Sequence, residues 1–199
     1  MPGKIRRVSA DEFIQLAENM PVIDVRSPGE YDYGKIPGAI NIPLFNDRER
    51  AMVGAIYTHQ GRAEAATAGM GMIAPALSEK MKRALDIASD GKLLVYCWRG
   101  GMRSESMAWL FSVAGITPIV LEGGYKAYRN LVLSGLSVKR KFIILGGLTG
   151  SGKTSILKEL EKRGEQMTDL EGLACHKGSA FGALGQKEQP SSEHFANLL

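Results

Sequence analysis

The stretch KLLVYCWRGGMRS, residues 92–104, decides the fold of this chain. Residues 93–96 are apolar and rich in β-formers, and so short a run predicts a strand that is buried on both faces of a parallel sheet. From Ser104 to Ala114 the apolar residues recur with a helical period. Because a strand, a short loop and a helix form the repeating unit of parallel sheets, we expect an α/β architecture.

Other parts of the chain repeat this pattern. We predict further strands at residues 21–25, 119–121 and 142–146, and further helices at 9–19, 76–88 and 154–163. Strands that alternate with helices predict a parallel sheet with helices on both faces. The segment 46–74 has no clear period, and we expect an extended loop followed by a short helix there, with no chemistry assigned to it.

The loop after the strand at 92–96 carries the first candidate site. Cys97 would stand at the carboxyl end of a buried strand, where open α/β sheets place their working residues. Two arginines and the start of a helix favour the thiolate form of this cysteine, and glycines let backbone N–H groups turn toward one centre. We expect a cradle for a tetrahedral anion, which Arg103 closes with a bidentate contact. The candidate residues are Cys97 as the catalytic group, with Arg99, Gly100, Gly101, Arg103 and Ser104 in the anion loop.

A second loop follows the strand predicted at 142–146. Residues 147–154 read GLTGSGKT, which fits the Walker A pattern between a strand and a helix. Its backbone N–H groups would surround a phosphate group, with Lys153 adding positive charge and Thr154 a ligand for Mg²⁺. Such a loop recognises phosphates and not a base, so the ligand and the need for Mg²⁺ stay open. The candidate phosphate-binding residues are Gly147, Thr149, Gly150, Ser151, Gly152, Lys153 and Thr154.

A polar stretch at residues 134–141, which ends in Lys139-Arg140-Lys141, separates the two loops. We therefore predict one domain over residues 1–135 and the N-terminal part of a phosphate-loop domain over 136–199. Only 58 residues run from Phe142 to Leu199, fewer than a domain of ordinary size contains. We expect the second domain to be incomplete for this reason.

Composition excludes several classes of protein. With 199 residues, 44% of them hydrophobic and 23% charged, the chain is neither disordered nor collagen-like. The net charge of +4 suits a polyanionic partner without requiring one. Two cysteines, Cys97 and Cys175, give neither a zinc pattern nor a disulfide framework, and we expect no metal site. No apolar run is long enough to cross a membrane, and we expect a cytoplasmic protein with no membrane partner.

Four segments in order make residues 1 to about 132 resemble a rhodanese domain. The segments are DVRSPGEY at 24–31, GKIPGAINIP at 34–43, the Cys97 loop and LEGGY at 121–125. The resemblance implies that Cys97 carries sulfur or selenium as a persulfide or perselenide, and that Asp24 and Arg26 are mostly architectural. Five residues separate Cys97 from Arg103, one more than in thiosulfate-using rhodaneses, which favours a larger, phosphate-like anion. Rhodanese-fold phosphatases share this spacing, but Tyr96 stands where they usually have histidine.

The two loops together resemble the tRNA 2-selenouridine synthases, in which a rhodanese domain is fused to a P-loop domain. The segment DLEGLACHKGSAFG at 169–182 adds to the likeness. The fold implied is a rhodanese-like domain with a central parallel sheet, followed by a partial P-loop NTPase-like α/β domain. The family replaces the sulfur of wobble 2-thiouridine in tRNA with selenium from selenophosphate, through an S-geranyl intermediate made with geranyl diphosphate. Those two compounds are expected as substrates, with no tightly bound cofactor.

Further residues have less definite roles. The basic side chains Lys126, Arg129, Lys139, Arg140 and Lys141 would contact tRNA phosphates. Asp169 is a further candidate in the second domain and is equally well read as a cap. The main alternative is a rhodanese-type sulfurtransferase with an appended nucleotide-binding domain, and the third is a tRNA-binding module without catalysis. The sequence leaves open which tRNAs are substrates and which oligomer forms.

Overall fold

The computed structural model describes residues 5–148 and 150–199 of the chain. The chain divides into two compact units, Met1–Leu131 and Val132–Leu199. Each unit is described below by itself.

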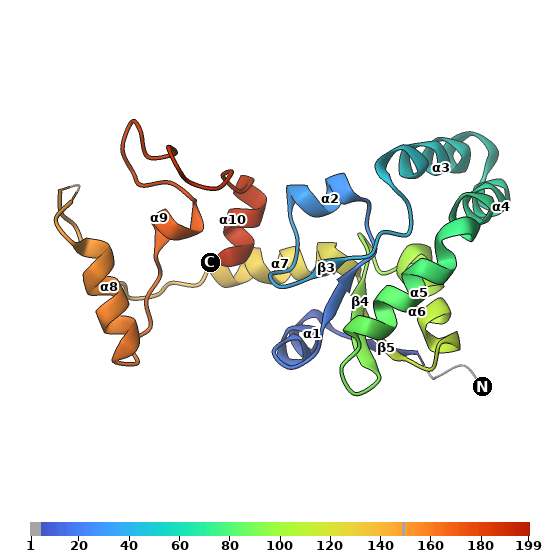
Figure 1. Cartoon of the computed structure of the whole chain (residues 1–199), viewed down its shortest axis with the longest axis horizontal. Helices are drawn as coiled ribbons and strands as arrows, with labels where there is room; N and C mark the ends of the chain where they lie inside the picture. The colour runs from blue at the N-terminus through green and yellow to red at the C-terminus, as the bar shows by residue number, and fades with distance from the viewer. Residues whose placement is uncertain (1–4, 149) are drawn as a thin grey trace. The chain divides into compact units, whose positions relative to one another are not determined.

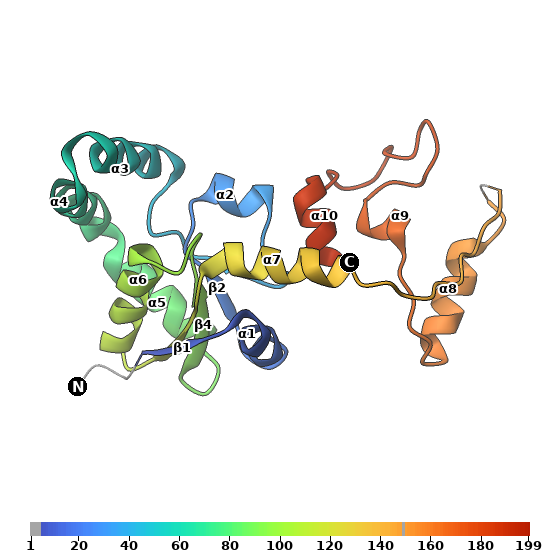
Figure 2. The same ribbon diagram turned by 180° about the vertical axis from the view of Figure 1, so that it is seen from behind.

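The first unit is built on a parallel sheet of five strands in the order β1-β5-β4-β2-β3. The strands are β1 Arg6–Val8, β2 Val22–Asp24, β3 Ile40–Asn41, β4 Lys92–Tyr96 and β5 Thr117–Leu121. The strands predicted at 21–25, 92–96 and 119–121 are thus present. Sequence reasoning missed β1 and β3, which are the two edge strands of the sheet. Figure 2 shows β1 near the N-terminus. Elements of two or three residues are too short to show a period.

Helices cover both faces of this sheet (Figure 1). The helices of the first unit are α1 Ala10–Ala17, α2 Pro28–Tyr33, α3 Asp47–Gln60, α4 Arg62–Ile73, α5 Leu77–Ile87, α6 Met102–Val113 and α7, which spans Gly124–Leu136 and crosses the boundary between the units. The helices predicted at 9–19, 76–88 and 104–114 correspond to α1, α5 and α6. None of the helices that the structure describes is long and apolar enough to span a membrane.

The prediction for residues 46–74 was wrong, because two well-formed helices occupy this segment instead of a loop and one short helix. Asn46 caps α3 by accepting a hydrogen bond from the backbone N–H of Glu49, and Gly61, at φ +101°, turns the chain into α4. Neither helix has a continuous apolar face. A period search cannot detect such helices, because it depends on that face.

The two faces of β4 pack against different helices. Leu93 and Val95 belong to a buried cluster with Met107 and Phe111 of α6. Tyr96 points to the opposite face, where its ring meets that of Phe13 from α1 edge-on at 6.4 Å. Burial on both faces holds the central strand rigidly, and with it the loop that follows.

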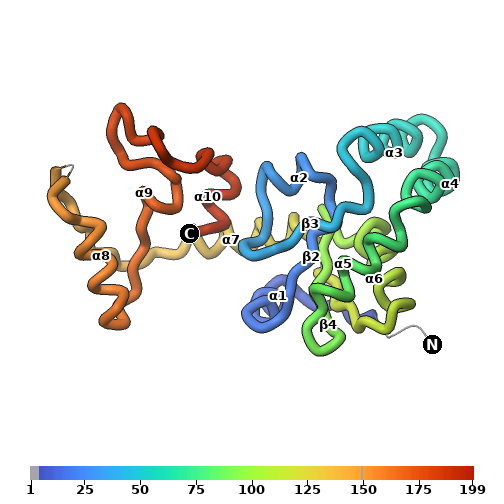
Figure 3. The backbone as a smooth tube through the Cα atoms, in the orientation of Figure 1, coloured from blue at the N-terminus to red at the C-terminus, as the bar shows by residue number. Residues whose placement is uncertain are grey.

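The second unit contains α8 Lys153–Lys162, α9 Leu170–Leu173 and α10 Ser192–Leu198, and the predicted helix at 154–163 is α8. The strand predicted at 142–146 is absent, because these residues are neither in a strand nor buried, and Ile143 is fully exposed. A parallel strand needs neighbouring strands for its backbone hydrogen bonds, and none of the residues described between 132 and 199 is in a strand. Between α9 and α10 the chain follows an irregular path (Figure 3).

Candidate active site

Cys97 directly follows β4, the middle strand of the sheet. The carboxyl ends of parallel strands lie at one edge of a sheet, and binding sites form there. Only 3% of Cys97 is exposed, and helix α6 begins five residues later at Met102. The strand, the loop and the helix are therefore arranged as the sequence predicts.

The Cys97 thiol lies close to the hydroxyl group of Ser104 and farther, at 4.0 Å, from the carbonyl oxygen of Gly101. Its Sγ lies 3.2 Å from Ser104 Oγ, which in turn lies 3.0 Å from the carbonyl oxygen of Gly101. When Cys97 is a thiol, it donates to Ser104 Oγ, and the hydroxyl proton goes to Gly101. When Cys97 is a thiolate, Ser104 turns its proton to the sulfur, since an anion accepts hydrogen bonds only. Ser104 can therefore stabilise both protonation states of Cys97.

The loop from Cys97 to Gly101 is held from outside by the first residues of α7. The backbone N–H groups of Tyr125 and Lys126 donate to the carbonyl oxygens of Cys97 and Trp98, at 2.8 and 3.0 Å. Gly124 allows this approach: a Cβ there would lie 2.4 Å from the carbonyl oxygen of Cys97, and its φ is +60°. Gly100 has a φ of +66°, and a Cβ there would lie 2.7 Å from the carbonyl oxygen of Leu121.

Several backbone N–H groups of the loop itself make no hydrogen bond within the described part of the chain. Among the residues that the structure describes, the backbone N–H groups of residues 98–104 have no acceptor within hydrogen-bonding distance. Those of residues 102–104 also form the N-terminus of the twelve-residue helix α6, where a positive partial charge favours anions. The loop therefore offers donors that an anion held at Cys97 can use.

Arg103 lies differently from the expectation that it closes the anion cradle. Its guanidinium makes a bidentate contact with the carboxylate of Glu30 in α2, at 2.6 and 3.2 Å. Burial tends to raise the pKa of Glu30, but the hydrogen bonds and charge of Arg103, with smaller contributions from Ser27 and Arg50, outweigh it and lower this pKa. Glu30 is a site residue to which sequence reasoning gave no role, although it lies in the quoted segment 24–31. Arg99 is exposed.

A cavity of about 490 Å³ opens beside this ion pair. It is lined by Gly29, Glu30, Tyr33, Arg50 and Trp98. Trp98 follows Cys97 directly in the chain, so the cavity borders the Cys97 loop on its α2 side. There is therefore open space next to the loop.

Asp24 and Arg26 form a buried ion pair under the site, in agreement with an architectural role. Both side chains are fully buried, with Arg26 Nη2 2.6 Å from an Asp24 carboxylate oxygen. The guanidinium also lies 3.9 Å from the ring centroid of Tyr125, the residue that binds the Cys97 carbonyl. Burial lowers the pKa of Arg26, but the hydrogen bonds and charge of Asp24 outweigh it and raise this pKa. Arg26 thus supports the start of α7, which holds the Cys97 loop.

The predicted phosphate loop has the turns that its sequence implies. Gly150 and Gly152 have φ values of +82° and +83°, and Gly152 caps α8 at its N-terminus. Lys153 Nζ donates to the carbonyl oxygens of Gly147 and Leu148, at 2.9 and 3.0 Å. The Lys153 ammonium group thus lies across the loop, where a phosphate is expected. Ser151 and Thr154, which are close to it in the sequence, are exposed. Thr149 lies outside the described residues.

The other candidates of the second unit have local partners. The Asp169 carboxylate accepts a hydrogen bond from the Gly172 N–H at 3.0 Å and so caps α9, while no strand precedes it. His176 Nδ1 accepts from the Gly178 N–H, at 3.1 Å, in a turn where Cys175 has a positive φ of 50°. Of the basic residues expected to contact tRNA, Lys139, Arg140 and Lys141 of the second unit are exposed. In the first unit, Lys126 is exposed and Arg129 is half-buried.

Two known families match the chain. The rhodanese-like domain family matches residues 9–131, and the family described as the tRNA 2-selenouridine synthase AAA domain matches residues 140–199. The first match covers more than half of the chain and contains the whole Cys97 site. The second contains the predicted phosphate loop.

Several curated proteins match this chain over nearly its whole length. The tRNA 2-selenouridine synthase of Bdellovibrio bacteriovorus is 39% identical over 98% of this chain and 52% of that protein. Those of Cupriavidus pinatubonensis and Sulfurovum sp. are 42% and 43% identical, over 90% and 91% of this chain and 49% and 50% of theirs. The chain thus spans about half the length of these curated relatives.

A solved structure agrees with the fold of the first unit. The N-terminal domain of a Clostridium difficile 630 protein named as ATP/GTP binding matches with a TM-score of 0.57 and 38% identity. The match covers 65% of this chain and 99% of that domain. A rhodanese-like domain followed by the AAA-domain segment places this chain in the tRNA 2-selenouridine synthase family.

Proposed function

We propose that this chain takes part in replacing sulfur with selenium in the wobble 2-thiouridine of tRNA, as a transferase in which Cys97 carries the selenium. The observation that supports this most directly is the Cys97 loop. A nucleophile at the end of the central strand lies beside N–H groups that have no acceptor among the described residues. Selenophosphate is a tetrahedral anion that needs such donors.

The chemistry proposed starts at the Cys97 thiolate. The sulfur attacks the selenium of selenophosphate, the Se–P bond breaks with its electron pair on phosphorus, and phosphite leaves. The resulting perselenide attacks C2 of the S-geranyl-2-thiouridine, and geranyl thiolate departs and takes a proton from water. Two equivalents of a low-molecular-weight thiol then reduce the remaining S–Se bond and are oxidised to a disulfide, which frees the selenonucleoside and restores Cys97. Ser104 stabilises the thiolate at both ends of this cycle.

The test is intact-protein mass spectrometry together with ³¹P NMR after incubation with selenophosphate. We expect a mass increase of one selenium atom that Cys97→Ser abolishes, with phosphite as the phosphorus product. Cys175→Ser is the matched control, because this half-buried cysteine lies outside the loop, and it should take up selenium normally. Phosphate as the only product with no adduct on Cys97 would overturn the carrier role. Efficient transfer of sulfur from thiosulfate to cyanide would favour the sulfurtransferase alternative.

We assign the loop at residues 147–154 to geranyl diphosphate, whose diphosphate group would draw Lys153 Nζ away from the carbonyl oxygens of Gly147 and Leu148. Backbone N–H groups at the start of α8 supply further donors. Lys153→Ala should weaken binding of geranyl diphosphate about tenfold or more, since a charged hydrogen bond contributes about 1.5–3 kcal/mol. Lys158→Ala, at an exposed position of α8, is the control. Equal affinities of the two variants in calorimetric titrations contradict this assignment.

The proposed polyanionic partner is the tRNA substrate. Exposed Lys126 and the basic run Lys139-Arg140-Lys141 supply positive charge for its phosphates. Each phosphate contact that is lost should reduce the slope of log affinity against log salt concentration by about one. Replacement of all four residues by alanine, measured by filter binding at several salt concentrations, tests this.

A further inference from the structure

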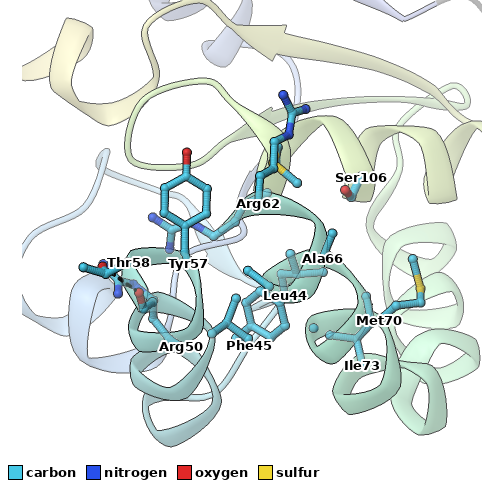
Figure 4. Close-up of a pocket in the computed structure, with 16 residues that line it drawn as sticks. Leu44, Phe45, Arg50, Tyr57, Thr58, Arg62, Ala66, Met70, Ile73 and Ser106 are labelled. Atoms are coloured by element: carbon cyan, nitrogen blue, oxygen red, sulfur yellow. Dashed lines mark hydrogen bonds between the residues drawn. The ribbon is translucent and has the colours of Figure 1, made fainter. Parts of the chain in front are cut away.

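An apolar pocket of about 480 Å³ lies between α3, α4 and the start of α6 (Figure 4). Leu44, Phe45 and Ile73 are among the residues that line it, and the side chains of the two helices lie on either side of it in this view. Most of the lining comes from residues 44–73, to which sequence reasoning assigned no chemistry. The volume falls within the range of about 300–1,000 Å³ that is usual for small-molecule pockets.

Small residues leave this space open. Gly54, Ala65, Ala66 and Gly69 all line the pocket. A Cβ at Gly69 would lie 3.0 Å from the Phe45 ring, so Phe45 is packed closely against α4 and forms a wall of the pocket. The helices α3 and α4 pack against each other, and these small residues leave a hollow beside their contact.

Large apolar side chains at the pocket are exposed to water. Tyr57, Met70 and Met102 are 57%, 55% and 41% exposed, and all three line the pocket. An exposed apolar surface that surrounds a concave pocket marks a binding site for an apolar group. Methionine and tyrosine suit this role because the first adapts its shape and the second has an apolar ring with a polar end.

The pocket borders the Cys97 site. Met102 and Arg103, in the first turn of α6, belong to its lining. The next residue in the chain is Ser104, whose Oγ lies 3.2 Å from Cys97 Sγ. A ligand in the pocket therefore lies one turn of α6 from the nucleophile.

Positive charge accompanies the apolar lining. Arg50, Arg62 and Arg103 line the pocket, and no aspartate or glutamate does so among the residues described. Arg103 and Arg50 lie 2.6 and 3.8 Å from Glu30 and are partly neutralised by it. Arg62 is exposed and makes no ion pair with any residue that the structure describes. The ligand that fits is an apolar chain attached to a polyanion.

We propose that this pocket binds the geranyl chain of S-geranyl-2-thiouridine in tRNA and so places the C2–S bond of the nucleoside beside Cys97. The inference rests on the proposed function and adds the site that holds the leaving group. The branched hydrocarbon contacts Phe45, Tyr57 and Met70, and Arg62 faces the RNA phosphates. A geranylated nucleoside then binds in preference to one without the chain, because the pocket removes apolar surface from water.

A binding experiment on the full chain tests this with two nucleosides, S-geranyl-2-thiouridine and S-methyl-2-thiouridine. The wild-type chain should bind the geranyl compound at least about tenfold more tightly, since several apolar groups become buried. Ala66→Trp, which fills the pocket, should abolish this preference. Ala63→Trp is the matched control, because Ala63 is exposed on the same helix but does not line the pocket, and it should retain the preference. A preference that survives Ala66→Trp overturns the inference.

Photocrosslinking gives an independent readout. S-geranyl-2-thiouridine with a diazirine at the end of its chain should label peptides from residues 44–73, and Ala66→Trp should remove the label. Labelling confined to residues 140–199 overturns the inference and leaves the role of Cys97 untouched. Labelling of residues 44–73 in a chain that takes up no selenium on Cys97 overturns the proposed function and supports the pocket as a prenyl site.

Discussion

At the scale of single residues, the partner of Arg103 is the main departure from expectation. Its spacing from Cys97 suggested a ligand for the substrate anion, but in this structure both of its Nη groups bind Glu30, 73 positions earlier in the chain. The Arg103–Glu30 pair carries no net charge, so it attracts a phosphate only weakly. Arg103 therefore holds α2 and α6 together at the mouth of the site.

Glu30→Gln should destabilise the chain by about 1–2 kcal/mol at neutral pH, between the values for an exposed pair and a charged buried hydrogen bond. The pKa of Glu30 in the folded chain is below its usual value of 4.5. Its stabilising effect is therefore complete above that value and is lost as the pH falls through the folded pKa. Urea unfolding at pH 7 and in the acid range measures the difference.

The control for Glu30→Gln is a carboxylate that forms no ion pair with any arginine that the structure describes. Glu64→Gln, at an exposed position of α4, should leave the stability within about 0.5 kcal/mol of the wild type at both pH values. If the cost of Glu30→Gln stays constant down to the most acidic pH, the ion pair is not its source.

At the scale of elements, the shape of the Cys97 loop depends on α7 as much as on the loop's own residues. The N-terminus of α7 donates to the carbonyl oxygens of Cys97 and Trp98. The segment LEGGY at 121–125 contains Tyr125, which makes the first of these hydrogen bonds. Sequence reasoning used this segment only as part of a family resemblance. Two consecutive glycines after a strand are the signal that two backbone segments approach each other.

Gly124→Ala should therefore disturb the Cys97 loop. The positive φ alone costs about 1–3 kcal/mol, and the Cβ would overlap the carbonyl oxygen of Cys97. We expect a lower urea midpoint and slower alkylation or selenium uptake of Cys97, followed by mass spectrometry. Gly135→Ala in the same helix has free space around its Cβ and should be neutral or stabilising. Equal behaviour of the two variants would show that α7 does not shape the loop.

Two short apolar runs, both predicted to be strands, have different structures. The run at 93–96 lies between β2 and β5 and is buried on both faces, whereas residues 142–146 pair with no strand and are exposed. Strand propensity expresses a preference for a pleated surface with neighbours. A local pattern can therefore locate a candidate strand but cannot supply the strands that flank it.

At the scale of the whole molecule, the two units differ in their backbone protection. Leu94 donates to Pro21 within the sheet, whereas the N–H groups of residues 139–147 have no backbone acceptor among the described residues. Hydrogen exchange followed by mass spectrometry should find the amides at 139–147 exchanged at the earliest times and those at 93–96 protected by orders of magnitude. Slow exchange at 142–146 would show that this segment has hydrogen-bonding partners in solution.

The sequence by itself determined the α/β class, the central strand with Cys97 at its end, and the helices α1, α5, α6 and α8. These features depend on the periodicity of apolar residues, on short apolar runs and on the conformations that glycine permits. All of these signals come from residues that are close together in the sequence. Only the tertiary structure decided the partner of Arg103, the hold of α7 on the Cys97 loop and the pocket between α3, α4 and α6. Each of these joins segments that are far apart in the chain, and its energy arises only when the folded backbone brings them into contact.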